Sequence, residues 1–323
     1  MARRSKTADP EEVRGELIRR LVEFEPILRA GAVREQVKAL VPVAHALRDL
    51  GGSLMASSKK ASGRARILEY LRAHVGEVIE GGELMVVAGI DDYARRIREL
   101  RKEDGWPILS GVTARQMVQS QEEEDVTDAL KQMRVDDYML LEDRRDEDAA
   151  RRWKIANTIR NSKSGVQSKV LAYLQANVGI HVTGEELRYV AKAKNEWPRR
   201  TRELRTEQGW PVVTRFSGDP SLPVGIYVLA ENKQSPVHDR NINELTRRAV
   251  LQRDHWACQW EGCGWSHERL AFDKRFLELH HIREHAEGGS NEADNLVTLC
   301  NLHHDEVHRS GELHLNDQAA TLL

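Results

Sequence analysis

The chain has 323 residues and a mass of 36.8 kDa, about twice the usual length of one domain, so two or three domains are expected. Hydrophobic residues make up 40% and charged residues 31%, and no apolar run reaches the roughly 18 residues of a membrane span, which excludes an integral membrane protein. No apolar stretch follows the basic start MARRSK, and three cysteines are too few for a disulfide framework. We therefore expect an intracellular, cytoplasmic protein in a reducing compartment.

The formal net charge is −2, which by itself predicts no nucleic-acid partner. Histidine is distributed unevenly, because ten of the 13 histidines lie in the last 88 residues, together with all three cysteines. Candidate site chemistry is therefore expected in the C-terminal part.

The first predicted elements are two amphipathic helices in residues 11–50, separated near Gly31. The stretch Gly51–Gly63 is rich in Gly, Ser, Ala and Lys, which is typical of a flexible linker. We treat residues 1–60 as an N-terminal helical segment.

An internal repeat follows. The stretch RARILEYL realigns with QSKVLAYL at an offset of 103 residues, which becomes 104 at the third helix, so we infer a duplication with one inserted residue. The predicted repeats cover 64–143 and 167–231, and a linker helix is expected in 144–166 at Asp146–Asn161.

Each repeat predicts three helices and a two-stranded hairpin. The third helix ends at Gly105 or Gly209, and a Trp-Pro pair then begins the first strand. The second strands are expected at Tyr138–Leu141 and Gly225–Leu229. This order resembles a winged helix-turn-helix with the hairpin as the wing. In the first copy the polar stretch Thr113–Arg134, with the acidic run Glu122–Asp125, predicts a long or poorly ordered wing.

The third helix of each repeat is rich in arginine. Guanidinium groups suit phosphate and the edge of guanine, so we expect contact with DNA. Basic helices can also be solvated faces, and winged helices can be protein-protein modules, so this alternative stays open. The candidate DNA-binding residues are Arg95, Arg96, Arg98, Arg101, Arg199, Arg200, Arg202 and Arg205.

Cysteine spacing in the last domain predicts a metal site. Four residues separate Cys258 from Cys263, and His303 follows Cys300 by three positions. Two such pairs, about 40 residues apart, are typical of a tetrahedral structural zinc site. The alternative is a group of buried free thiols beside an incidental histidine.

Histidine spacing predicts a second site. Leu277–Ile282 alternates as a strand that contains His280 and His281, whose side chains point to opposite faces. Asn295–Leu299 is a short apolar run that leads into a helix, on which His304 and His308 share one face. One imidazole of the pair is thus placed to bind a metal and the other to address a substrate.

The order of strand, His-His, Gly-Gly loop, Asn, strand and helical His resembles the HNH nuclease family, the ββα-metal fold, over about Arg247–His308. Two departures are His303, where the fourth zinc ligand is usually cysteine, and His280, where many members have aspartate. We place this domain at 240–323. The expected fold class is multidomain and mainly α with small β hairpins.

The resemblance implies roles for individual residues. His281 would be the general base, and His280, His304 and His308 would hold one divalent ion, Mg²⁺ or Mn²⁺. Asn295 would orient His281 or brace the loop. Candidates for phosphate binding are Arg275 and Arg283, whereas we expect packing or surface roles for His255, His267, His285 and His314.

The resemblance implies a sequence-specific endonuclease that cuts double-stranded DNA and leaves 5′-phosphate and 3′-hydroxyl ends. Two DNA-reading modules beside a nuclease look like a type II restriction enzyme of a prokaryotic cell, and dependence on base modification stays open. A double-strand cut needs two active sites, so a homodimer is expected, with residues 11–50 as one possible interface. The alternatives are a non-enzymatic, zinc-containing DNA-binding regulator and a nuclease acting on RNA or branched DNA.

Overall fold

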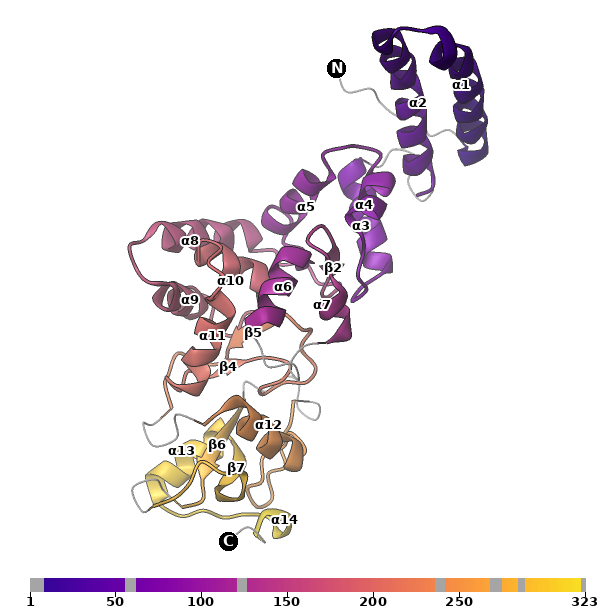
Figure 1. Cartoon of the computed structure of the whole chain (residues 1–323). Helices are drawn as coiled ribbons and strands as arrows, with labels where there is room; N and C mark the ends of the chain where they lie inside the picture. Colours follow the sequence, from indigo (N-terminus) through magenta and orange to yellow (C-terminus); the bar gives the residue numbers. More distant parts are fainter. Residues whose placement is uncertain are drawn as a thin grey trace. The chain divides into compact units, whose positions relative to one another are not determined.

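The computed structural model describes residues 9–55, 62–120, 127–235, 242–267, 275–283 and 288–320. The described chain is mostly helical with small antiparallel sheets (Figure 1). It divides into two compact units, one formed by 1–111 and 133–150 and the other by 112–132 and 151–323. None of the described helices has the length and apolar character that crossing a bilayer requires.

The first unit begins with a helical hairpin. The two predicted helices form, and α1 (Pro10–Ala30) and α2 (Val33–Ser53) lie side by side (Figure 1). The expected linker begins later than predicted, because α2 continues through its two glycines. A Cβ atom on Gly51 would lie 2.5 Å from the carbonyl oxygen of Val86, so only glycine allows this close packing. Residues 56–61 of that linker lie outside the described residues.

The first repeat folds around one apolar core. Its elements are α3 (Gly63–Ala73), α4 (Gly81–Ala88), α5 (Tyr93–Lys102), β1 (Ile108–Ser110) and β2 (Tyr138–Leu140). β1 pairs antiparallel with β2, and Ile79 forms a bridge with Tyr138 beside them. The buried core residues are Ile67, Leu71, Ile79, Leu84, Ala88, Ile97, Leu100, Ile108 and Leu140.

The predicted first wing is wrong for the part that the structure describes. Residues after β1 form α6 (Gly111–Ser120) and α7 (Asp128–Gln132), whereas the acidic run Glu122–Asp125 lies outside the described residues. Helix α6 packs in the second unit. The Thr113 hydroxyl donates to Glu185 at 2.6 Å, and Trp197 Nε1 donates to Gln116 at 3.0 Å. These tertiary contacts stabilise a helix that the polar sequence did not indicate.

The second repeat has the same order of elements. After the connecting helix α8 (Ala149–Asn161) come α9 (Val166–Gln175), β3 (Val182–Thr183), α10 (Gly184–Val190), α11 (Trp197–Thr206), β4 (Val212–Val213) and β5 (Ile226–Leu229). The sheet order is β3-β5-β4, with both pairings antiparallel. The two repeats thus differ mainly in the helical insertion between the hairpin strands of the first.

The C-terminal part is built on α12 (Glu244–Arg253), β6 (Leu277–His281), β7 (Leu296–Cys300), α13 (Asn301–Ser310) and α14 (Asp317–Ala320). β6 and β7 pair antiparallel, with His281 opposite Leu296. Apolar side chains of both strands, together with Val250, Leu251 and Val307, form a separate core. This ββα arrangement, predicted from the sequence, brings the end of β6 next to α13.

Candidate metal centres

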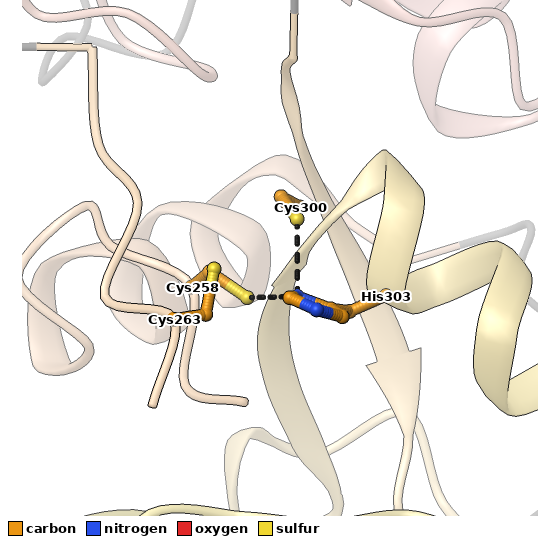
Figure 2. Close-up of side chains that lie close together, drawn as sticks. All are labelled: Cys258, Cys263, Cys300 and His303. Carbon is orange, nitrogen blue, oxygen red and sulfur yellow. Dashed lines mark hydrogen bonds between the residues drawn. The ribbon is translucent and has the colours of Figure 1, made fainter. Parts of the chain in front are cut away.

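Cys258, Cys263, Cys300 and His303 converge as the spacing predicts, with their ligand atoms all within 4.8 Å of one another. Figure 2 shows the two sulfurs of the loop after α12 meeting the end of β7 and the first turn of α13. The Sγ atoms of Cys258 and Cys300 lie 3.5 Å and 3.3 Å from Nδ1 of His303. The Trp260 ring stacks on the His303 ring, with centroids 4.8 Å apart, and holds it in place.

The protonation of this cluster fits a cation. A hydrogen bond to Cys258 lowers the pKa of the Cys300 thiol to about 5, and the same contact raises the pKa of Cys258. One sulfur is therefore a thiolate near neutral pH, which is the form that binds metal. Four protein donors leave no position for water, so this centre suits a structural role.

A second cluster joins β6 to α13. The ring nitrogens of His280, His304 and His308 lie within 4.8 Å of one another, and Nε2 of His304 lies 3.3 Å from Nε2 of His308. The rings of His280 and His308 meet edge to face, with centroids 4.9 Å apart. His280 and His304 are buried. Three protein donors leave coordination positions open, which is the pattern of catalytic metal centres.

Glu278 orients one of these histidines. Its carboxylate lies 3.2 Å from Nδ1 of His304 and accepts a hydrogen bond of 3.0 Å from the Ser235 hydroxyl. With Nδ1–H directed at Glu278, Nε2 of His304 faces the cluster. Burial by itself raises the pKa of Glu278, but His304, Ser235 and Arg247 together lower it, so this side chain is a carboxylate at neutral pH. Our sequence reasoning missed Glu278, although its position two residues before His280 places both on one face of β6.

His281 lies at the end of β6 with Nε2 at 2.7 Å from Oδ1 of Asn291, a residue that the sequence analysis did not single out. Asn295 braces the loop instead of orienting His281. Its amide donates to the carbonyl oxygens of Arg283 and Ser290 at 3.0 Å and 2.8 Å, and its Oδ1 accepts from Arg283 N–H at 2.9 Å.

The Gly-Gly loop is closed by the same contacts. A Cβ atom on Gly289 would lie 1.8 Å from the carbonyl oxygen of Arg283 and 2.8 Å from Nδ2 of Asn295. Glycine at this position therefore permits the close approach that Asn295 holds.

The remaining candidates lie at other places. Arg275 lies beside the cysteine cluster, with Nη1 at 3.9 Å from Sγ of Cys263. His267 faces Asp219 at 3.5 Å, and His314 meets the edge of the Trp260 ring, which agrees with packing roles. His255 is exposed, and His285 lies outside the described residues.

The arginines of the third helices repeat one arrangement. Arg95 and Arg96 share Glu99 on α5, and on α11 Arg199 and Arg200 share Glu203 in the same way. Arg98 is exposed, and Arg101 and Arg202 are half-buried.

Arg205 differs from its predicted role in DNA contact. Its guanidinium is buried and donates from Nε and Nη2 to Glu244 of α12, at 3.0 Å and 2.6 Å. The last turn of α11 faces the C-terminal part of the chain, so the guanidinium of Arg205 forms an ion pair within the protein.

Two family comparisons agree with this geometry. Residues 258–310 match the HNH endonuclease family, and residues 64–141 and 167–230 match the KpnI N-terminal domain, from a restriction-enzyme family. A search of curated proteins and a search of solved structures gave no match. The C-terminal part is thus an HNH endonuclease domain, and the two matches together support a nuclease of the HNH restriction type.

Proposed function

We propose that this chain is a sequence-specific type II restriction endonuclease that hydrolyses phosphodiester bonds in double-stranded DNA by a one-metal mechanism. The observation that carries the proposal is the juxtaposition at the end of β6, where His281 follows directly on the cluster of His280, His304 and His308. Comparison of methylated with unmethylated DNA will determine whether the target base must be modified.

In this proposal His281 is the general base. Asn291 Oδ1 accepts a hydrogen bond from Nε2–H, which makes Nδ1 the nitrogen that takes a proton from the attacking water. Asn295 holds the loop that carries Asn291 and therefore acts as a positioning residue.

Three imidazoles would bind the catalytic metal ion, and one carboxylate would orient one of these imidazoles. A divalent ion, Mg²⁺ or Mn²⁺, bound by His280, His304 and His308 would supply positive charge at the scissile phosphate. Glu278 keeps His304 in the tautomer that binds cations. A Zn²⁺ ion on Cys258, Cys263, Cys300 and His303 would tie the start of α13 to β7 and so fix the adjacent His304.

We propose further that both repeats are winged helices that bind the duplex. The order of three helices and a hairpin supports this, as does the sheet order β3-β5-β4 of the second copy. The third helices α5 and α11 would contact DNA through Arg95, Arg96, Arg98, Arg101, Arg199, Arg200 and Arg202. Cutting both strands would require a homodimer.

The test is cleavage of matched unmethylated and methylated plasmid DNA by the purified chain with Mg²⁺ or Mn²⁺. Discrete fragments are expected from at least one substrate, and the His281→Ala variant should lose them while it still binds DNA. His74→Ala, which changes a partly exposed histidine of the first repeat, is the matched control and should cut normally. Cleavage by His281→Ala would exclude this base. If the chain binds duplex DNA but cleaves neither duplex DNA, branched DNA nor RNA, it would instead be a zinc-containing DNA-binding regulator.

A further inference from the structure

The N-terminal hairpin leaves most of its large apolar side chains exposed. Among its hydrophobic residues whose burial the structure describes, Val13, Val43 and Ala46 are the buried ones. Ten of the 18 exposed large hydrophobic side chains in the described residues lie on this short segment. An apolar contact surface is therefore expected on the hairpin. The ten side chains are Ile18, Leu21, Val22, Leu28, Val33, Val37, Leu40, Val41, Leu47 and Leu54.

The exposed side chains of α2 follow a heptad. Val33, Val37, Leu40, Ala44 and Leu47 are separated by four, three, four and three residues, so they form one stripe along the helix. A second stripe with the same alternation packs toward α1 and consists of Gln36, Ala39, Val43, Ala46 and Leu50. Two adjacent stripes on one helix indicate two helical neighbours. Helix α1 supplies one of them, and α4 meets the exposed stripe at its C-terminal end, where Gly51 packs against Val86. The part of the stripe from Val33 to Leu47 is left exposed.

Helix α1 carries a matching pair of stripes. Its inner stripe contains Val13, Leu17 and Phe24, whereas Ile18 and Leu21 lie on the exposed side. A helix in a four-helix bundle contacts two neighbours in this way, so the hairpin has the pattern of half a bundle.

We propose that a second copy of this chain covers the exposed face and that the two hairpins form a four-helix bundle. Complete burial of all ten side chains, each about half exposed, would remove at most about 900 Å² per copy, which is of the size of the 800 Å² per partner of a standard interface. Residues 9–55 contain seven basic and eight acidic residues, so two copies of this segment have only a small net charge to repel each other.

A dimer would bring together the two active sites that a double-strand cut requires, and in this respect the inference rests on the proposed function. The association itself depends only on the hairpin. It is therefore measured on the full chain without DNA and without added divalent metal.

The experiment is size-exclusion chromatography with light scattering, from nanomolar to micromolar protein. The expected mass is twice the 36.8 kDa of the chain. The double variant Leu40→Glu, Leu47→Glu should have the mass of one chain at every concentration, because charges on the stripe oppose apolar burial. Val135→Glu makes the same kind of change at a side chain 52% exposed, compared with 58% for Leu47, and should remain dimeric.

Circular dichroism and bound zinc, unchanged in the double variant, would show that the chain is still folded. If the charges unfold the hairpin, Leu40→Ala with Leu47→Ala, which preserves helix propensity, should shift the equilibrium toward monomer. A wild-type chain with the mass of one copy at all concentrations would overturn the proposal, as would folded double variants of either kind that dimerise like wild type. A dimer that cuts no substrate would count against the proposed function and not against this surface.

Discussion

Glu278 shows how one residue links the metal cluster to the rest of the chain. It lies on β6, on the same face as His280, and its carboxylate contacts both His304 on α13 and Ser235, which follows the second repeat. A carboxylate that accepts from the second ring nitrogen of a metal-binding histidine fixes the ring and increases its basicity. The residue is therefore placed to position His304, the proposed metal ligand.

Replacement of Glu278 tests this role. Glu278→Gln keeps the shape of the side chain but removes its charge, so the affinity for Mn²⁺ should fall by about 10- to 100-fold. Isothermal titration of the full chain measures the affinity, and zinc content reports whether the cysteine cluster is intact. Ser235→Ala removes only the hydroxyl that supports Glu278 and should have a smaller effect. An unchanged Mn²⁺ affinity in Glu278→Gln would mean that Glu278 does not position His304.

At the scale of elements, α5 and α11 have corresponding arginines in different surroundings. Arg101 and Arg205 occupy matching positions, but Arg101 is half-buried, whereas Arg205 is buried in an ion pair with Glu244. A buried pair with both partners present is tolerated, whereas loss of one partner leaves an uncompensated charge. The charge of a residue therefore predicts its role poorly until its neighbours are known.

Arg98 in α5 and Arg202 in α11 lie in the middle of the third helices, and their replacement tests the predicted contact with DNA. Arg98→Ala with Arg202→Ala should weaken binding to duplex DNA at all sequences if both guanidiniums contact phosphate. The slope of log affinity against log salt should then decrease by about 1 for each contact removed. Filter binding or fluorescence anisotropy over a salt series measures this slope. Arg144→Ala, which removes a 59% exposed arginine outside these helices, should leave it unchanged, and equal slopes in all three proteins would argue against both helices.

For the whole molecule, the number of active sites determines the product. A dimer holds two HNH domains and is expected to linearise supercoiled plasmid. A single chain, with one HNH domain, is expected to cut one strand at a time. The double variant Leu40→Glu, Leu47→Glu should therefore accumulate nicked circular DNA before linear DNA appears, and Val135→Glu should not. Agarose gels of a time course distinguish these forms. Direct linearisation by a monomeric variant would mean that one chain cuts both strands.

The sequence predicted the local arrangement of the candidate metal ligands, because this signal depends on spacing within one element or one turn. The repeats were visible because two stretches of the chain resemble each other at a fixed offset. His304 and His308 share a helix face by their separation alone, and the alternation of β6 separates His280 from His281. Family matches at 64–141, 167–230 and 258–310 coincide with the repeats and the histidine-rich domain.

Other features were decided by contacts between residues far apart in the chain. Helix α6 forms because Thr113 and Gln116 find partners in the second repeat, whereas their local sequence is polar enough to predict a loop. Asn291, and not Asn295, contacts His281 because the loop folds back on itself. Periodicity indicates that α2 has apolar stripes, but only the packing of α1 distinguishes the covered stripe from the exposed one. The sequence thus determined the candidate ligands and the repeats, and the tertiary structure determined which side chains are buried, paired or exposed.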